Sequence, residues 1–334
     1  MNNSYRIISA GSSDDDAEDL ADAGPAFELR PWFASTAEHG LRLDQALARL
    51  VPELSRSYLQ QLIAAGAVAI NGASIVKPST RLKAGDVGTL EMRPTLQSQA
   101  FKPEAMALDL VYQDAHLMVI NKPAGLVVHP APGNWTGTLM NGLLAFDPAF
   151  MGLPRAGIVH RLDKDTSGLM VVARNRVTMD ALVRAIGARE VHRHYLALAH
   201  GRWSGADRRE VNQPIGRDPR QRLRMAVVDL DTHAGKAART DITLLQNAEA
   251  ACWVRCVLQT GRTHQIRAHM AWLGHPLVAD ELYGGTCAAG LTRQALHAYG
   301  LAFAHPATGQ AMAFKSDVPP DIQAALELWG LRYN

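Results

Sequence analysis

The sequence has few cysteines and no long apolar run, and these absences exclude several classes of protein. Cys252, Cys256 and Cys287 show no regular spacing, so the sequence predicts no disulfide framework and a reduced, cytoplasmic protein. The amino-terminal stretch MNNSYRIISAGSSDDD lacks the apolar core of a signal peptide. No apolar stretch approaches about 18 residues, the length of a membrane span. We therefore expect neither a secreted protein nor a membrane protein.

Motifs for nucleotides and metals are also missing. The sequence contains no glycine-rich nucleotide-binding loop. Its densest histidine segment places His264 and His269 five residues apart, which is not one face of a helix. The glutamate of an H-E-x-x-H zinc motif is absent there. The sequence therefore predicts no metal site.

Acidic residues are concentrated at the amino terminus, and the rest of the chain is basic. Residues 1–28 hold seven acids and one base, Arg6, in a Ser-, Asp-, Ala- and Gly-rich context that is typical of a disordered leader. Because the whole chain has 34 bases and 32 acids, the remainder carries a formal charge of +8. This charge suits a polyanionic partner such as a nucleic acid, and a solvated basic surface explains it equally well.

Residues 41–93 have the pattern of a small α+β domain. The stretch LDQALARLV has helical apolar spacing, Ser55 is a candidate N-cap for the following helix, and Asn71-Gly72 predicts a hairpin turn. The order of elements, with the RLD, SRSYLQQLI and VAING stretches, resembles the S4 RNA-binding domain. That resemblance implies RNA contacts, with Arg56 among the few bases available. A packed unit without an RNA role is the alternative.

After a linker expected at residues 94–107, residues 108–330 are expected to form one catalytic domain. Strand candidates outnumber helices and do not alternate strictly with them, which predicts an α+β fold with a mixed, largely antiparallel sheet. Helices are expected in VTMDALVRAIGAR and HQIRAHMAWLG. The strand candidates are LDLVYQD, LMVINKP, SGLMVVARN, HRHYLALAHG, RTDITLLQN and ACWVRCVLQT.

The segment GIVHRLDKDTSG, residues 157–168, places charged residues directly before the apolar run LMVVA. Asp163 and Asp165 could converge as the carboxylate pair of a glycosidase-type hydrolase. The DTSG stretch also predicts a turn in which the Asp165 side chain bonds its own backbone. Asp163, between Arg161 and Lys164, is then an ionised carboxylate that can act as nucleophile or base. A plain salt-bridged turn is the remaining alternative.

A second charged segment, residues 260–280, reads TGRTHQIRAHMAWLGHPLVAD. Thr263 is a candidate N-cap for an amphipathic helix. Arg267 lies at the edge of the apolar stripe of that helix, where its side chain can reach a neighbouring carboxylate. The amino terminus of the helix, with Arg262 and His264, suits a phosphate.

These segments resemble the RluA family of RNA pseudouridine synthases over about residues 108–306. The matching stretches, in order, are LVYQDAHLMVINKPAGLVVHP, GIVHRLDKDTSGLMVVAR, HRHYLAL, TGRTHQIRAH with GHPLVADELYG, and RQALHAYGLAFAHP. The resemblance implies an isomerase, an intramolecular transferase, that converts uridine in RNA to pseudouridine. The C1′–N1 bond breaks, the base turns and C5 joins the sugar, without redox change or group donor, so no cofactor is expected.

The resemblance also implies roles for individual residues. Asp163 matches the catalytic aspartate of the family, Arg267 the arginine that pairs with it, and Tyr195 the tyrosine that stacks beside the uracil. Arg161 matches the arginine that enters the RNA when the target base flips, with a phosphate clamp as the alternative. For Tyr195 the alternative is a core aromatic. Lys122, in the Asn-Lys-Pro turn, is expected to meet a phosphate or to pack at a strand end.

Within the family, PRAGIVHRLDKDTSGLMVVA, RDPRQRLRMAV and GKAARTDI fit best the members that modify a hairpin loop, helix 69, of large-subunit (23S) ribosomal RNA. The expected partner is ribosomal RNA or the pre-ribosomal large subunit, bound by a monomer. Two positions depart from the family pattern: Ala279 replaces a glycine, and Arg193 replaces a lysine. The alternatives are the same chemistry on other ribosomal or transfer RNA uridines, and a non-catalytic RNA-binding protein of ribosome assembly.

Overall fold

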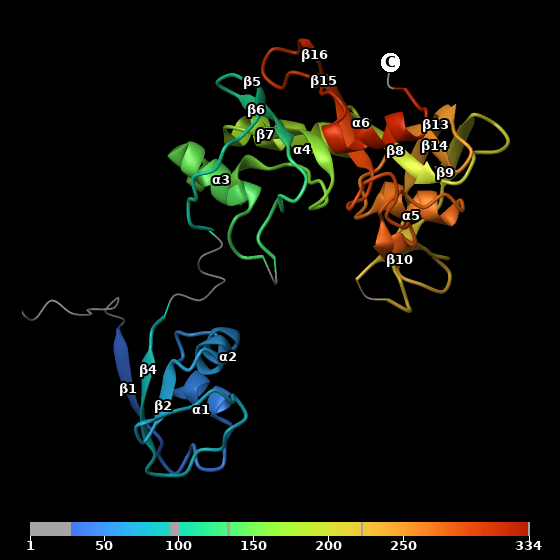
Figure 1. Cartoon of the computed structure of the whole chain (residues 1–334). Coiled ribbons are helices and arrows are strands. Elements are labelled where there is room, and N and C mark those ends of the chain that lie inside the picture. The colour runs from blue at the N-terminus through green and yellow to red at the C-terminus, as the bar shows by residue number, and fades with distance from the viewer. Residues whose placement is uncertain (1–27, 94–100, 132–133, 222, 333–334) are drawn as a thin grey trace, which may run out of the picture. The chain divides into compact units, whose positions relative to one another are not determined.

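The computed structural model describes residues 28–93, 101–131, 134–221 and 223–332 (Figure 1). The chain divides into two compact units, Met1–Thr95 and Leu96–Asn334. The expected acidic leader lies outside the described residues except for Glu28, and so does the first half of the expected linker. No helix of the described part is long and apolar enough to cross a membrane.

The amino-terminal unit is an antiparallel sheet, ordered β1-β4-β2-β3, with two helices. The predicted helices and hairpin are confirmed. Strand β1 was not predicted, because its proline is unusual in a strand and is tolerated here at the edge of the sheet. The elements are β1 (Leu29–Phe33), α1 (Leu43–Leu50), α2 (Arg56–Ala64), β2 (Val68–Ile70), β3 (Ala73–Ser74) and β4 (Val87–Glu91).

Local sequence explains this unit well. The Ser55 hydroxyl accepts a hydrogen bond from the Tyr58 N–H and caps α2, as predicted. Asn71 and Gly72 both have positive φ, 50° and 83°, which a two-residue hairpin turn requires. The apolar stripes of α1 and α2 form one core with the sheet, and Leu47 and Leu59 are fully buried in it.

The large unit is built on a nine-stranded sheet with the order β5-β6-β7-β15-β8-β14-β13-β9, and β16 pairs with β15. Among the described strands only β7 and β15 run parallel, so the predicted largely antiparallel sheet is confirmed. The strands are β5 (Leu110–Gln113), β6 (Leu117–Lys122), β7 (Ser167–Ala173), β8 (His192–His200), β9 (Arg208–Asn212), β13 (Arg239–Asn247), β14 (Ala251–Leu258), β15 (Leu296–Ala304) and β16 (Ala311–Lys315).

Both faces of this sheet are covered, which explains the nearly continuous apolar strands. Along β8, Tyr195 and Ala197 share one core with Ile266, whereas Leu196 shares another core with Ile322. Four helices of the large unit supply the covering side chains: α3 (Leu139–Phe146), α4 (Arg176–Ala188), α5 (Gln265–Trp272) and α6 (Pro320–Leu328).

Small elements complete the large unit. A three-stranded sheet contains β10 (Ile215–Arg217), β11 (Met225–Val227) and β12 (Gly235–Lys236), and α5 packs beside β11. Short 3-10 helices that lie wholly in the described part are η2 (Pro148–Gly152), η3 (Pro154–Gly157) and η4 (Glu281–Tyr283). The last of these lies beside α5 and supplies a side chain to the site described below.

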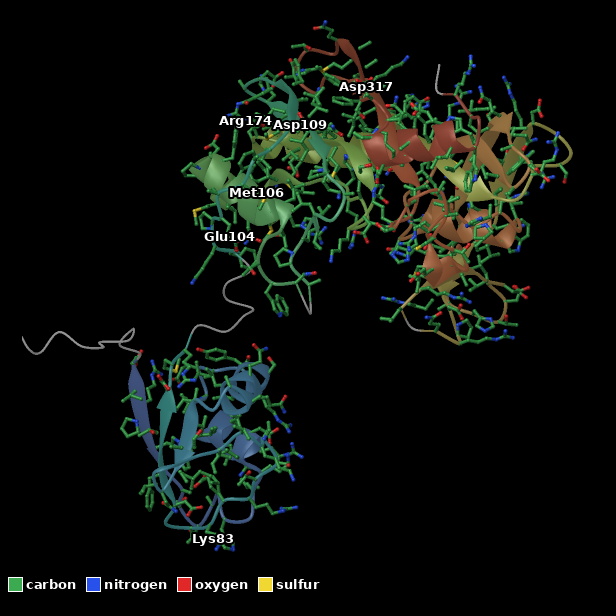
Figure 2. All side chains as sticks on the ribbon, in the orientation of Figure 1. Lys83, Glu104, Met106, Asp109, Arg174 and Asp317 are labelled. Atoms are coloured by element: carbon green, nitrogen blue, oxygen red, sulfur yellow. The ribbon has the colours of Figure 1, made fainter. Side chains whose placement is uncertain are left out.

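The described part of the expected linker packs against α3 (Figure 2). The Glu104 N–H donates to the Asn141 carbonyl at 3.0 Å, and the Glu104 carboxylate accepts from the Gly137 N–H at 2.8 Å. A Cβ on Gly142 would lie 2.5 Å from Met106 Cγ, so the glycine in α3 makes room for this methionine. Residues 101–106 therefore belong to the large unit.

Candidate active site

A cavity of about 710 Å³ in the large unit brings the two charged segments together. Its wall is formed by residues 159–163 before β7, by Arg193 and Tyr195 on β8, and by residues 258–267 between β14 and α5. Asp163 is the only carboxylate among the described lining residues, which include six arginines. The cavity therefore suits an anionic ligand.

Asp163 lies in a tight turn at the wall of this cavity. The Thr166 N–H donates to the Asp163 carbonyl at 3.1 Å, and β7, fully buried, begins one residue later. Leu162 packs into the core, while the Asp163 side chain remains 17% exposed. Arg161 and Asp163 therefore precede a buried strand because they line a cavity, together with Thr166, the residue directly before β7.

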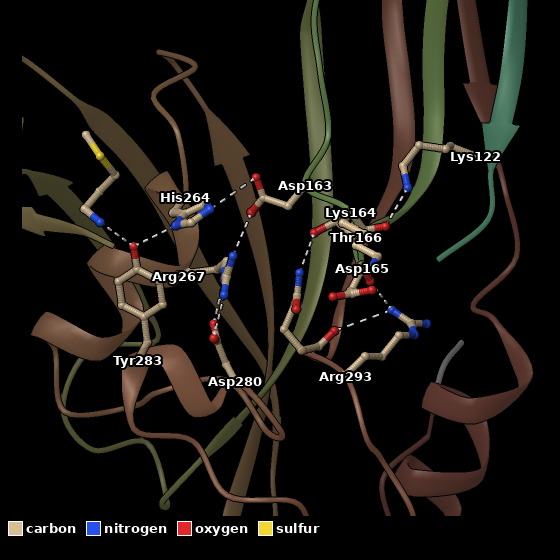
Figure 3. Close-up of polar contacts among 12 residues, drawn as sticks. Lys122, Asp163, Lys164, Asp165, Thr166, His264, Arg267, Asp280, Tyr283 and Arg293 are labelled. Carbon is tan, nitrogen blue, oxygen red and sulfur yellow. Dashed lines mark hydrogen bonds and ion pairs between the residues drawn. The ribbon is translucent and has the colours of Figure 1, made fainter. Parts of the chain in front are cut away.

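Asp165 is directed elsewhere. It does not line the cavity, and its carbonyl accepts a hydrogen bond at 2.9 Å from Arg293 (Figure 3). Arg293 is also paired with Asp321. The turn is closed by the Asp163 carbonyl, so the predicted bond from the Asp165 side chain to its own backbone is not the one that forms it. The two aspartates do not share the cavity, and the glycosidase-type pair is not formed.

Arg267 holds the Asp163 carboxylate from the first turn of α5. Its Nη1 donates to Asp163 Oδ2 at 3.1 Å, while Nε and Nη2 donate to both oxygens of Asp280 at 2.8 and 2.7 Å (Figure 3). Burial alone would lower the pKa of the Arg267 guanidinium, but Asp280 and Asp163 together raise it. The bidentate pair with Asp280 thus fixes the Arg267 guanidinium in the position from which it donates to Asp163 and orients that carboxylate.

His264 and Tyr283 form a second link to Asp163. His264 Nε2 lies 3.8 Å from Asp163 Oδ1, and its Nδ1 lies 3.0 Å from the Tyr283 hydroxyl, which accepts from the Met225 N–H at 2.9 Å (Figure 3). Burial lowers the pKa of His264, with the Asp163 carboxylate opposing that shift. Burial raises the pKa of Tyr283 to about 12. The protonated Tyr283 hydroxyl donates to Nδ1 of the neutral His264 imidazole. The ring proton is then on Nε2, which faces Asp163.

The start of α5 differs from the prediction. Thr263 is not the N-cap: the helix begins at Gln265, and the cap position belongs to His264, which has a left-handed φ of 54° and no side-chain cap bond. The Gln265 side chain accepts instead from the Arg262 N–H at 3.0 Å and the Thr260 hydroxyl at 2.7 Å. This arrangement turns the His264 ring towards Asp163.

Tyr195 lies on β8 opposite Cys256, with its side chain in the cavity wall and only 5% of the residue exposed. Burial raises the pKa of its hydroxyl. Tyr195 belongs to the apolar core and also lines the cavity, so the core position expected as the alternative does not remove its side chain from the site.

Of the remaining residues predicted to bind RNA in the large unit, three line the cavity and Lys122 does not. Arg161 and Arg262 line the cavity with His264, and Arg262 Nε donates to the Ala237 carbonyl at 3.1 Å. Lys122 does not line it: its ammonium is buried and donates to the carbonyls of Pro123, Leu126 and Lys164 at 2.8–3.0 Å. The structure therefore favours strand-end packing for Lys122 over the expected phosphate contact.

Arg56 lies in the amino-terminal unit at the start of α2. Its guanidinium donates to the fully buried Asp44 carboxylate at 2.8 Å, which also accepts from Arg42 and Gln60. Burial alone would raise the pKa of Asp44, but these donors lower it. Arg56 thus has a structural partner, and about half of its side chain remains exposed for an RNA contact.

Sequence reasoning missed two residues of the site, Asp280 and Tyr283. Their position after α5 in VADELYG gives no local signal that either contacts the Asp163–Arg267 pair. Among the described residues, no three His, Cys, Asp or Glu side chains are grouped as ligands for a metal ion.

Comparisons with known proteins agree with this architecture. Residues 116–272 match the RNA pseudouridylate synthase family, and residues 41–87 match the S4 domain. The chain is 46% identical over 302 residues to "Ribosomal large subunit pseudouridine synthase D" of Neisseria meningitidis serogroup B, covering 86% of this chain and 79% of that protein. The Xanthomonas campestris protein of the same name is 44% identical over 310 residues, covering 88% and 91%.

A solved structure shows the same fold. "Human RNA Pseudouridylate Synthase Domain Containing 1" is 27% identical and superimposes with a TM-score of 0.53, covering 67% of this chain and 90% of that one. The fold, the cavity and these relatives define one class of protein, the isomerases of uridine in RNA. The chain belongs to the RluA family of RNA pseudouridine synthases and carries an S4 domain before its catalytic domain.

Proposed function

We propose that this pseudouridine synthase acts on large-subunit ribosomal RNA, at uridines in the hairpin loop of helix 69, with Asp163 as its catalytic residue. Relatives that are 46% and 44% identical to this chain over the aligned residues carry a name that states the large-subunit substrate. The S4 domain and the arginine-rich cavity suit a polyanionic RNA substrate. In the cytoplasm, this RNA is either free or part of an assembling large subunit.

One observation carries the catalytic assignment: Asp163 is the only carboxylate among the described residues that line the cavity, and it is held by Arg267 in a wall that also contains Tyr195. A flipped uridine that enters this cavity would meet an oriented carboxylate and an aromatic ring together. Charge-assisted bonds to Arg267 favour the ionised form of Asp163, which attack or proton abstraction requires.

The proposed roles follow from the bonds that change. The reaction breaks N1–C1′, forms C5–C1′, releases the proton from C5 and returns a proton to N1, so the product has the mass of the substrate. Asp163 attacks the sugar or the base, or removes a sugar proton, and all three routes use the same carboxylate. Tyr195 stacks on the turning base and stands near the departing C5 proton. Arg161, exposed at the rim, occupies the space that the flipped base leaves.

The substrate is tested by mapping. Purified protein is incubated separately with large-subunit ribosomal RNA, small-subunit ribosomal RNA and transfer RNA, and pseudouridine is located by chemical modification and primer extension. The proposal predicts new pseudouridine in the helix 69 loop of the large-subunit RNA alone. Modification of transfer RNA or of another ribosomal site would contradict the substrate while leaving the chemistry intact. The same RNA presented in isolated pre-ribosomal subunits distinguishes free from assembled substrate.

A further inference from the structure

Arg193 is a buried cation at the cavity wall. It is 9% exposed, its Nε is buried without a hydrogen bond, and its side chain forms no hydrogen bond or ion pair with any residue that the structure describes. A buried guanidinium without an anionic partner is unfavourable, because desolvation of the charge is not compensated. Such a cation is expected where a ligand supplies the partner.

The position of Arg193 connects it to the reacting residues. Arg193 and Tyr195 are two residues apart on β8, so their side chains lie on the same face of the sheet, and both line the cavity. The charge of Arg193 adds to burial in lowering the pKa of His160 to about 3 and opposes the burial-driven rise in the pKa of Tyr195. His160, Arg193 and Tyr195 all line the cavity.

Gly261, in the loop that precedes α5, makes room for this guanidinium. A Cβ at that position would lie 2.7 Å from Arg193 Nη1. The side chain is therefore confined between β8 and the loop that leads to Arg267, rather than free to leave for solvent.

No carboxylate of the cavity is available to Arg193. Asp163 is the only acidic residue among the described lining residues, and it is already bound to Arg267. The RNA substrate has no anionic group other than its phosphates, whereas the uracil carbonyls are neutral. A phosphate is thus the substrate group that compensates a buried positive charge.

We propose that Arg193 binds a backbone phosphate flanking the target uridine and so positions the flipped nucleotide against Asp163. The proposal rests on the RNA-uridine isomerase activity and on Asp163 as the reacting carboxylate, and it is independent of the large-subunit substrate. A planar guanidinium can donate to two phosphate oxygens at once, whereas the lysine usual in the family is a point charge.

The experiment uses a short RNA that contains a uridine modified by the wild-type protein, whichever RNA that is. Each of the two phosphates flanking the target is replaced, one at a time, by an uncharged methylphosphonate. Single-turnover rates and apparent affinities are measured for the wild-type protein, Arg193→Gln and Arg193→Lys. If wild-type protein modifies no ribosomal RNA, the substrate proposal fails, and the same experiment proceeds on the RNA that it does modify.

For one of the two phosphates, the methylphosphonate should lower wild-type kcat/KM by about 10- to 100-fold, the range expected for a charge-assisted hydrogen bond. The same replacement should change kcat/KM of Arg193→Gln less than about twofold, because the partner is already gone. Arg193→Lys should recover part of the lost activity on normal RNA. Equal losses in wild type and Arg193→Gln at both phosphates would overturn the proposal, and so would wild-type activity of Arg193→Gln.

Arg255 supplies a matched control. It lies on the neighbouring strand β14 and also has a buried Nε without a hydrogen bond, but it does not line the cavity. Arg255→Gln should therefore keep the full wild-type sensitivity to the methylphosphonate. If Arg193→Gln does not fold, Gly261→Ala displaces the guanidinium by steric contact alone, and it should weaken the same phosphate dependence. Full sensitivity to the methylphosphonate in folded Gly261→Ala, together with unchanged kcat/KM on normal RNA, would count against the proposal.

Discussion

Arg267 donates to Asp163 at 3.1 Å while the rest of its guanidinium is tied to both oxygens of Asp280. The second aspartate has no place in the cavity lining, so its contribution is to hold Arg267 in one orientation. Through this three-residue chain, the proposed catalytic carboxylate is oriented by a residue that does not line the cavity.

Asp280→Asn should impair catalysis through Arg267. Without the second charge, Arg267 can turn towards Asp163 or away from it, and a small displacement of a catalytic group lowers the rate by about 100-fold. We expect kcat to fall by that order while the apparent affinity for RNA changes little, measured in single-turnover assays. Asp321→Asn, which removes the partner of Arg293 outside the cavity, serves as the control. An unchanged kcat for Asp280→Asn would remove Asp280 from the account.

Tyr283→Phe should destabilise the large unit. Its hydroxyl accepts from the Met225 N–H and lies 3.0 Å from His264 Nδ1, and the variant leaves both groups without this partner. We expect a loss of about 1–3 kcal/mol in the free energy of unfolding, measured by urea denaturation. Tyr299→Phe is the comparison, since the Tyr299 hydroxyl has no hydrogen bond to a described residue. Equal stabilities for the two variants would contradict the proposed link.

Ala279→Gly should stabilise the protein. Ala279 has a φ of 59°, in the left-handed region that favours glycine, and the chain turns there towards Asp280. We expect a gain of about 1 kcal/mol in the free energy of unfolding, and a loss of similar size for Ala268→Gly inside α5. Thermal or urea unfolding of the two variants measures both effects. A loss of stability in Ala279→Gly would show that the methyl contacts outweigh the backbone preference.

The free energy of unfolding should decrease as the pH is lowered, over a pH range set partly by His297. Burial lowers the pKa of His297 to about 4, from 6.5 in an unperturbed chain. Between these values the unfolded chain binds a proton that the folded chain does not, so stability declines as pH falls through the window. One such group contributes up to about 1.4 kcal/mol per pH unit. His297→Asn should make the slope between pH 6 and 4.5 shallower by about that amount, and the exposed His233→Asn should not. Identical slopes for His297→Asn and wild type would refute this.

Much of the fold was predictable because its elements have strong local patterns. The apolar runs of β6, β7, β8 and β14, the Asn71-Gly72 turn and the Ser55 cap each identified an element. The start of α5 was predicted one residue too early, because His264 adopts a left-handed conformation that no local pattern favours.

The site was predictable only in part, because its contacts join residues far apart in the chain. The pairing of Asp163 with Arg267 spans 104 positions and was inferred from the family resemblance. No local pattern indicates that Asp280 completes the pair, or that the Lys122 ammonium is taken up by a carbonyl 42 residues away. Those contacts depend on how the sheet brings its strand ends together.

The most direct measurement is tritium release from RNA labelled at uracil C5, using large-subunit ribosomal RNA with wild-type protein and Asp163→Asn. The variant is nearly isosteric and removes the charge that Arg267 binds. We predict release by wild type, no release by Asp163→Asn, and similar RNA affinities for the two proteins. Release at the wild-type rate by folded Asp163→Asn would contradict the central claim that this carboxylate drives the isomerisation.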